Sequence, residues 1–400
     1  MEKLTSRERI LNTIEGRPVD RIPIWPPIPW HPLAPGPPEG DWKLQPNYLA
    51  ILDKVKEHCD FLVNLMIPEG RTHESSVEEY ARRAAYGGIF DRRFFLSPPE
   101  LISSHDEIDE SGSKVTTYTL QTPKGDLRMV ERIDPGIDTT WLTEPLVKTT
   151  DDAEKLLSVP YRFDPPDLDS FFADVEKLGD RGVPVIFVTS PMVMVSHMTD
   201  LQRFLEWSML EKPLVDRMIQ TIYEREVERL QYILDKGVDA IIRFGGSEQA
   251  TPPLMPHSFF EEFILQYEKP LWQLAQKAGK HVWVHCHGKI SSVIDDFIEG
   301  GVKLTDPVEP PPQGDIEIGE AKRRARKGPM TLVGNIEHVD FYKRTPEEME
   351  KLVEEAVCTE GKEYLILGHS DFLISEINEK TRDNCISYIE SGIKYGRSDI

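Results

Sequence analysis

The amino-acid sequence predicts an α/β protein built on a TIM (β/α)8 barrel, with an antiparallel β-hairpin insertion after the second strand. Eight short apolar segments rich in β-branched residues are spread along the chain, and most are separated by helical patterns, as in parallel βα units. Polar residues gather where these segments end. No glycine occurs in the first segment, IPIWPPIPW, which disfavours an open doubly wound sheet with a phosphate-binding loop.

The N-terminal residues predict a helix followed by a strand. The helix is capped by Thr5 or Ser6 and ends at Gly16. Residues 21–25 (RIPIW) then form a short strand. Residues 26–38 contain too many prolines for a helix or a central strand, so we expect a long ordered loop or a lid there.

The pattern changes after the second strand, which we expect at 61–67. From about 85 to 150, apolar and polar residues alternate around a PKGD turn, which predicts a β-hairpin. We interpret this stretch as an insertion into one domain that spans residues 1–400. The other six strands alternate with helical patterns and are expected at 183–190, 238–246, 281–288, 302–308, 330–336 and 363–370.

The composition excludes several classes of function. A net charge of -22 repels DNA and anionic lipid, so we expect no nucleic-acid partner. No apolar run approaches ~20 residues, and the N-terminus lacks the apolar core of a signal peptide, so no membrane segment is expected. The four cysteines are scattered without a disulfide framework, which is typical of reduced thiols. We therefore expect a soluble cytoplasmic enzyme.

Polar residues at the ends of the predicted strands are the candidate site, because the chemistry of a TIM barrel lies at the carboxyl ends of its strands. We select one set for catalysis, substrate binding or metal binding: Trp25, Trp30, Arg243, Glu248, His285, His287, Asp306, Asn335 and His369.

The stretch HVWVHCHG contains three of the chain's histidines. Alternate side chains of a strand share a face, so His285 and His287 point together, and if they point into the barrel, Cys286 points outward against the helices. Two histidines one pleat apart, roughly 6.5–7 Å between Cα atoms, can bind one ion. His369 is the natural third ligand and Glu248 the fourth, a donor set that suits Zn²⁺ and also Fe²⁺, Co²⁺ or Ni²⁺. The same spacing is also typical of a metal-free substrate pocket.

Several stretches resemble the uroporphyrinogen decarboxylase superfamily, in particular its methyltransferase-like branch. That branch contains the methylcobamide:coenzyme M methyltransferases and the corrinoid-dependent O-demethylase methyltransferases. The matching stretches follow the family's order along nearly the whole chain: SRERILNTIEGRPVDRIPIW, TPKGDL, GGSEQATPPLMPHSFFEEFILQYEKPL, VHCHGKI, GNI and ILGHSD. The family fold is a TIM barrel, in agreement with the strand count.

The resemblance implies a zinc site. Family methyltransferases bind zinc through a His-x-Cys-Gly motif and a later cysteine. By position, the motif's histidine falls on His285, its cysteine on His287 and its glycine on Gly288, and the later cysteine falls on or next to His369. Both thiolates are thus replaced by histidine. Zinc held by neutral imidazoles is a stronger Lewis acid, which favours polarising an oxygen over binding a further thiolate such as coenzyme M.

The function expected is corrinoid-dependent methyl transfer. The methyl group would move between a small methylated or methoxylated compound, or a thiol or folate acceptor, and the cobalt of a partner corrinoid protein. Glu248 would be a metal ligand or a general acid, with Arg243 and Asp306 as further catalytic residues. Trp25, Trp30 and Asn335 would bind the substrate. The family analogy also allows a homodimer.

Two alternatives remain open from the sequence. The first is a metal-free decarboxylase or lyase acting on a small carboxylate or a tetrapyrrole. In it, Arg243 binds the carboxylate and His285 or Asp306 handles the proton. The second is a non-catalytic protein that binds a tetrapyrrole or a corrinoid.

Overall fold

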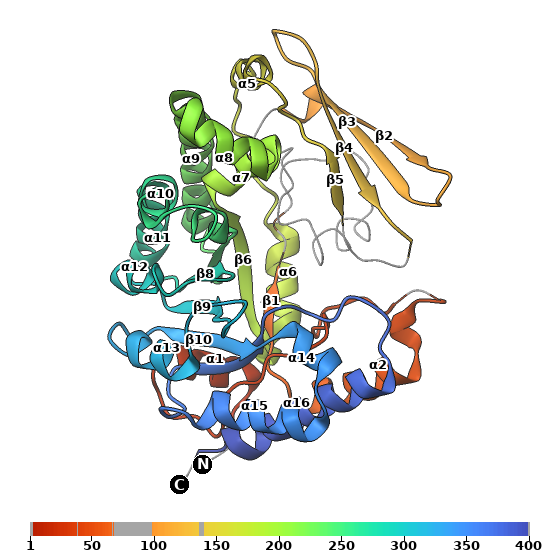
Figure 1. Ribbon diagram of the computed structural model, residues 1–400, viewed down its shortest axis with the longest axis vertical. Helices are drawn as coiled ribbons and strands as arrows, with labels where there is room; N and C mark the ends of the chain where they lie inside the picture. The colour runs from red at the N-terminus through yellow and green to blue at the C-terminus, as the bar shows by residue number, and fades with distance from the viewer. Residues whose placement is uncertain (1–2, 38, 66, 68–97, 136–139, 399–400) are drawn as a thin grey trace.

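A curled, parallel sheet of seven strands forms the centre of the molecule (Figure 1). A computed structural model describes residues 3–37, 39–65, 67, 98–135 and 140–398. Within these residues the strand order follows the chain, because each βα unit places its strand beside the previous one. The strands are β1 (Leu62–Asn64), β6 (Val183–Thr189), β7 (Ile241–Gly245), β8 (Val282–Cys286), β9 (Leu304–Pro307), β10 (Thr331–Ile336) and β11 (Leu365–His369).

Helices cover the outer face of this sheet (Figure 1). The α-helices are α1 (Ser6–Ile14), α2 (Pro46–His58), α5 (Thr150–Leu157), α6 (Asp169–Leu178), α7 (Pro191–Thr199), α8 (Leu201–Leu210), α9 (Lys212–Asp235), α10 (His257–Phe260), α11 (Gln266–Lys277), α12 (Ile294–Glu299), α13 (Ile318–Ala325), α14 (His338–Lys343), α15 (Pro346–Cys358) and α16 (Glu379–Gly396). Shorter turns include η1 (Trp42–Leu44), η3 (Pro99–Leu101), η4 (Gly179–Arg181), η5 (Ser247–Ala250) and η6 (Glu261–Leu265). In the part of the chain that the structure describes, no helix is both long enough and apolar enough to cross a membrane.

The N-terminal helix forms where the sequence predicts it. Thr5 is its N-cap, and the Thr5 side chain accepts a hydrogen bond from the backbone N–H of Glu8. The Glu8 carboxylate binds the N–H of Thr5 in return, which completes a capping box.

Strand alternation divides the core into two layers. One side of the strands packs into an inner cluster that fills the curl of the sheet: Trp25, Leu62, Val183, Val185, Ile241, Trp283, Leu304, Val333 and Ile366, with Ile10 and Ile14 of α1. The other side packs against the helices in a larger outer cluster. Strands buried on both faces read as continuous apolar runs, which is what the sequence shows.

The first predicted strand is not a strand in the structure. Residues 21–25 make only isolated bridges, one of which joins Ile24 to Leu367 of β11. On this side the N–H of Trp25 donates to the Leu367 carbonyl at 2.8 Å, and the N–H of Leu367 donates to the Pro23 carbonyl at 2.9 Å. Prolines at 23, 26 and 27 lack the N–H groups that a continuous ladder needs. The predicted eight-stranded barrel is therefore a seven-stranded sheet with a bridging segment beside its last strand.

Asp60 holds the other side of this segment. Its backbone N–H donates to the Ile24 carbonyl at 2.8 Å, and its carboxylate accepts from the Ile24 N–H at 3.0 Å. The same carboxylate, 1% exposed, accepts from Arg9 and from Arg21, each at 2.6 Å. One buried side chain thus fastens α1 and the bridging segment to the start of β1.

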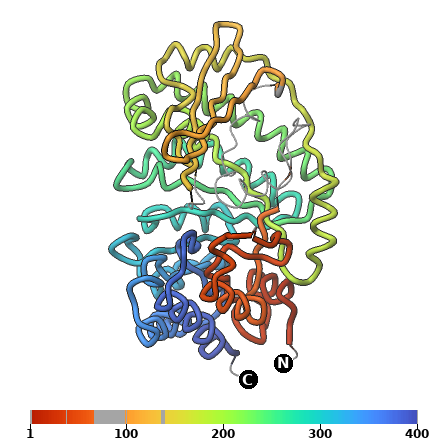
Figure 2. The backbone as a smooth tube through the Cα atoms, turned by 90° about the vertical axis from the view of Figure 1, so that its right-hand side faces the viewer, coloured from red at the N-terminus to blue at the C-terminus, as the bar shows by residue number. Residues whose placement is uncertain are grey.

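A separate antiparallel sheet follows β1. It contains β2 (Ile102–Ile108), β3 (Lys114–Leu120), β4 (Leu127–Ile133) and β5 (Trp141–Glu144) in that order. The predicted PKGD turn lies between β3 and β4, which pair antiparallel in register from Lys114–Ile133 to Leu120–Leu127. The structure has four strands where the sequence predicts one hairpin. Residues 85–97 of the predicted insertion lie outside the described residues. In Figure 2 this sheet lies at the opposite end of the molecule from the two chain termini.

Asp60 gives a first prediction. Asp60→Asn removes the charge that pairs with Arg9, whose guanidinium is itself buried, so the free energy of unfolding should fall by about 3–5 kcal/mol. Asp239→Asn is the matched control, because Asp239 pairs with Arg7 and Lys280 at a 69% exposed position, and the expected loss is about 0–1 kcal/mol. Urea unfolding measures both. Equal losses in the two variants would contradict the role given to Asp60.

Candidate active site

Three neighbouring strands carry polar side chains on their inner face at their carboxyl ends. Each of these residues lies two positions after a member of the inner cluster, so its side chain shares that face. They are Arg243 of β7, His285 of β8 and Asp306 of β9. The strand register sets His285 beside Asp306. The structure thus brings together three of the residues that the sequence selects, and Asn335 lies near the end of β10, the next strand of the sheet.

Asp306 is the centre of this group. One carboxylate oxygen accepts from Arg243 and from Nδ1 of His285, each at 2.8 Å, and the other accepts from the indole N–H of Trp283 at 2.5 Å. Burial alone would raise the pKa of Asp306, but the positive charge of Arg243 and the contact with His285 hold it at about 2. Because Asp306 is ionised, Nδ1 of His285 must carry the proton that it donates to the carboxylate. Nε2 is the ring nitrogen on the side away from Asp306.

Most of the Arg243 guanidinium is engaged by this arrangement, and its Nε is buried without a hydrogen-bond partner among the described residues. Besides the Asp306 contact, its guanidinium lies over the ring of Trp283, 4.2 Å from the ring centre. The side chain is 8% exposed. Arg243 therefore neutralises Asp306 and is poorly placed to bind a substrate carboxylate, the role that the decarboxylase alternative gives it.

His287 is held in the same way as His285. Its Nδ1 lies 3.1 Å from Glu309, which also accepts from the backbone N–H of Gly288. Burial opposes charge on His287, but Glu309, and then the more distant Glu248 and Asp306, raise its pKa to about 9. The two imidazoles are 4.6 Å apart and nearly perpendicular. Neither Nε2 has a hydrogen-bond partner among the described residues, so both are free for a ligand.

Two further acids border the histidines. Glu337 follows β10 directly, and burial, aided by the charge of Glu309, raises its pKa to about 7. Glu248 lies on η5, and its Oε2 is buried without a partner in the described part of the chain. The sequence-based selection includes Glu248 but misses the roles of Glu309 and Glu337. Their positions just after a strand end are the signal that could have found them.

The structure does not bring His369 to the other two histidines. On β11, His369 lies on the same face of the strand as Leu365 and Leu367, and these two side chains pack against the outer helices. Its Nε2 donates to the Pro26 carbonyl at 2.7 Å, and burial lowers its pKa to about 4. Its ring stacks on Trp25 at 5.1 Å. Within residues 3–37, 39–65, 67, 98–135 and 140–398, no three or more His, Cys, Asp or Glu side chains form a group that could hold a metal ion.

The predicted substrate-binding tryptophans have packing roles in the structure. Trp25 is 6% exposed and meets Trp283 edge-on at 5.9 Å in the inner cluster. Trp30 packs against Phe61 at 5.5 Å, with Lys56 over its ring, next to the start of β1. These contacts do not support a lid over the histidines. Cys286 is buried in the outer cluster, as predicted.

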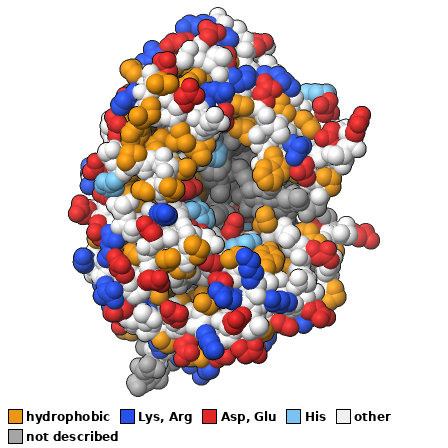
Figure 3. All heavy atoms as spheres, viewed as in Figure 1, with side chains coloured by type: hydrophobic (Ala, Val, Ile, Leu, Met, Phe, Trp, Pro, Cys, Tyr) orange, Lys and Arg blue, Asp and Glu red, His pale blue; other side chains and the backbone are white. Residues whose placement is uncertain are grey.

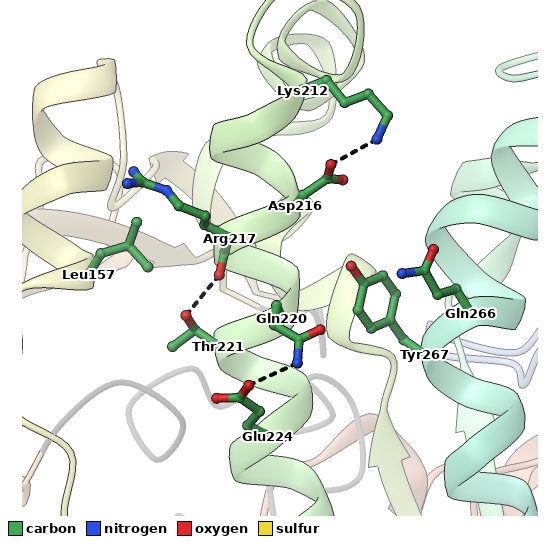
Figure 4. A pocket seen from close by; sticks show the side chains of 9 residues that line it. All are labelled: Leu157, Lys212, Asp216, Arg217, Gln220, Thr221, Glu224, Gln266 and Tyr267. Atoms are coloured by element: carbon green, nitrogen blue, oxygen red, sulfur yellow. Dashed lines mark hydrogen bonds and ion pairs between the residues drawn. The ribbon is translucent and has the colours of Figure 1, made fainter.

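Two hollows are visible on the surface. In Figure 3 one face of the molecule is hollowed at its centre, with histidine side chains at the edge of the hollow. A separate pocket of about 640 Å³ lies between α5, α9 and α11 (Figure 4). Its polar side chains largely pair with each other, as Lys212 does with Asp216 and Gln220 with Glu224, each at 2.8 Å. The histidine group is therefore the better candidate for chemistry.

The chain is similar to known proteins in sequence and in structure. The sequence profile of uroporphyrinogen decarboxylase (URO-D) matches residues 133–371. A methyltransferase from Methanosarcina mazei has a similar structure, with 14% identity, a TM-score of 0.58, and coverage of 98% of this chain and 99% of that one. A B12-independent methionine synthase from Shewanella sp. W3-18-1 is 11% identical, with a TM-score of 0.44 over 94% of this chain and 97% of that one. Among curated proteins there is no significant match.

The pKa of His287 gives a second prediction. In metal-free protein, nuclear magnetic resonance should show His287 titrating near pH 9, and Glu309→Gln should lower this pKa, because the main favourable charge is removed. A raised histidine pKa stabilises the folded state fully below pH ~6.5, and this contribution disappears as the pH rises through about 9. His369 is the control, since it should stay neutral from pH 6 to 9. A His287 pKa that does not respond to Glu309→Gln would refute this assignment.

Proposed function

The chain belongs to the uroporphyrinogen decarboxylase family, and on that premise we propose that it is a cytoplasmic methyltransferase. It moves a methyl group between a small methylated or methoxylated compound, or a thiol or folate acceptor, and the cobalt of a corrinoid on a partner protein. The observation that carries this proposal is the pair His285 and His287, each oriented by a carboxylate and each with a free Nε2. A TIM-barrel-like enzyme that works as a homodimer is part of the same proposal.

The two histidines fit a divalent metal such as Zn²⁺. A metal-binding histidine typically donates its second ring nitrogen to a carboxylate, which fixes its tautomer and its direction. Asp306 and Glu309 make this contact with the two rings. The negative charges that raise the pKa of His287, chiefly that of Glu309, would equally favour a bound cation that displaces its proton. His369 is left out of this ligand set, because its side chain faces the outer layer and its Nε2 is engaged.

When bound, the metal would polarise the oxygen from which the methyl group leaves. That oxygen keeps the electron pair of the broken bond and needs a proton. Glu248 is the residue proposed to deliver this proton, since its charge acts on His287 and its side chain is only partly exposed. Asp306 and Glu309 keep the imidazoles in place, and the amide of Asn335, near the end of β10, is proposed to bind a polar group of the substrate.

A carboxy-lyase is the second candidate, and the name of the matching family favours it. In that reaction a cation must bind the substrate carboxylate. Arg243 is already paired with Asp306, so the protonated His287 is the better candidate for this contact. The two functions differ in their products, which makes them easy to separate.

Metal binding gives a third prediction. Purified wild-type protein incubated with zinc should retain a stoichiometric amount after dialysis, measured by plasma mass spectrometry. His285→Ala and His287→Ala should lose it, because each removes a ligand, and Glu309→Gln should weaken binding about 10–100-fold. His369→Ala is the matched control and should retain the metal. Retention by His285→Ala, or loss in His369→Ala alone, would overturn the proposed ligand set.

Activity gives a fourth prediction. Cob(I)alamin supplied with a panel of methoxylated aromatic compounds should become methylated, which absorbance spectroscopy detects. Glu248→Gln should slow this reaction about 10²–10⁴-fold, because the leaving oxygen loses its proton donor. Carbon dioxide release from a panel of small carboxylates is measured in parallel. Release of carbon dioxide without any methylation of cobalamin would contradict the methyltransferase assignment and support a carboxy-lyase.

A further inference from the structure

The chain reverses the direction of its side chains where β9 ends. Within the strand, Leu304 belongs to the inner cluster, and Asp306 shares its face. Strict alternation would also turn Val308 to that face and Glu309 away from it. The structure has the opposite arrangement: Val308 is completely buried in the outer cluster, and Glu309 lies against His287. Because of this reversal, Asp306 and Glu309 both serve the histidine site.

The backbone of Val308 has a conformation that valine rarely adopts. Its φ is 57°, in the left-handed region, where a branched side chain is unfavourable. A residue in such a conformation persists only where its surroundings hold it there. The burial of the Val308 side chain among the outer apolar residues supplies this hold. Packing therefore maintains the reversal against a conformational cost.

Two glycines leave room for the backbone of the reversed segment. A Cβ atom on Gly334 of β10 would overlap the carbonyl oxygen of Pro307. A Cβ atom on Gly314 would overlap the carbonyl group of Glu309. Overlaps with backbone atoms cannot be relieved by turning a side chain, so the main chain itself would have to move. A side chain at Gly314 would therefore displace the residue that binds His287.

The loop that begins at Glu309 is fastened to the loop that follows the histidine strand. The Glu309 carboxylate accepts from the backbone N–H of Gly288 as well as binding the ring of His287. Further along, the Asp315 carboxylate accepts from the N–H and the hydroxyl of Ser291, at 3.0 and 2.6 Å. Both ends of the loop thus contact the same neighbouring segment, which keeps Glu309 close to His287.

We propose that Val308 is a positioning residue for Glu309, and that Gly314 provides the space that this position requires. Val308 anchors the segment in the outer cluster, and its left-handed backbone returns the next side chain to the histidines. Glu309 in turn fixes the tautomer and the direction of the His287 ring. The geometric role stands on the packing alone, whereas its consequence for a bound metal rests on the proposed function. Asp306 lies within the strand and does not depend on this reversal.

The geometric role is tested by crystallography, without metal or substrate. In Gly314→Ala, the Glu309 carboxylate should move out of hydrogen-bonding distance of His287, because the new methyl group displaces its main chain. Asp306 should stay 2.8 Å from His285, since strand pairing holds it. If Glu309 keeps its contact with His287 at 3.1 Å, Gly314 does not provide the required space, and the proposal fails.

Gly182→Ala is the matched control for this experiment. A Cβ atom on Gly182 would lie 2.7 Å from the carbonyl oxygen of Phe61, so this substitution also presses on a backbone group. The position directly precedes β6, at the amino ends of the strands and therefore away from the histidines. Its structure should retain the contact between Glu309 and His287. Loss of that contact in the control as well would show a general loosening of the fold and would overturn the proposal.

Zinc binding tests the role of Val308 itself. In competition with a chromophoric chelator, Val308→Ala should weaken zinc binding about 10–100-fold, as loss of an orienting carboxylate does. Combined with Glu309→Gln it should add little, because both substitutions remove the same contact. Val302→Ala is the matched control, since Val302 is equally buried in the outer cluster just before β9, and it should leave the affinity unchanged.

The outcomes separate this proposal from the proposed function. Equal zinc affinity in Val308→Ala and Val302→Ala would show that Val308 only fills the core, and the positioning role would be wrong. A wild-type protein that binds no zinc would refute the proposed metal site instead. In that case the crystal structures of Gly314→Ala and its control still decide whether the segment positions Glu309.

Discussion

The site depends on one buried negative charge, the carboxylate of Asp306. A charge removed from water is tolerated only where it is paired and hydrogen-bonded, and Asp306 meets this condition through donors on two neighbouring strands. The same contacts decide the direction and the tautomer of His285. The orientation of the His285 imidazole is therefore a property of the sheet itself and is independent of any loop.

His287 is held less firmly than His285, because its carboxylate partner does not lie within a strand. Its partner Glu309 comes from the segment after β9, whereas Asp306 lies within that strand. The His287 side chain is 35% exposed and the His285 side chain 21%. A site with one rigid and one more accessible nitrogen can bind a ligand at a fixed point and still adjust to its shape. We infer that the Nε2 of His285 is the fixed ligand position and that the Nε2 of His287 is the adjustable one.

The sequence predicts those parts of the structure that depend on local pattern. The cap at Thr5 follows from spacing alone and is confirmed, and so is the placement of His285 and His287 on one face of their strand, since their rings lie 4.6 Å apart. His369 could not be placed, because the run LILGH is apolar on both faces and gives no sign of which face is inner. The bridge at Ile24 depends on a side chain of Asp60 that is distant in sequence. The buried side chains of Ser190, Glu268 and Trp272 come from elements that only the fold brings together.

The bridging segment also has a consequence for the order of folding during synthesis. Its contacts with Asp20 and Asp60 lie within the first part of the chain, whereas the bond from His369 to Pro26 spans 343 residues. Long-range contacts form late, because a long loop must close first. The bridging segment can therefore form its contacts with the neighbouring N-terminal residues before synthesis of the chain is complete. The edge of the bridging segment that bonds to β11 stays unpaired until β11 has been synthesised. The docking of β11, which completes the inner cluster, is therefore among the last folding steps.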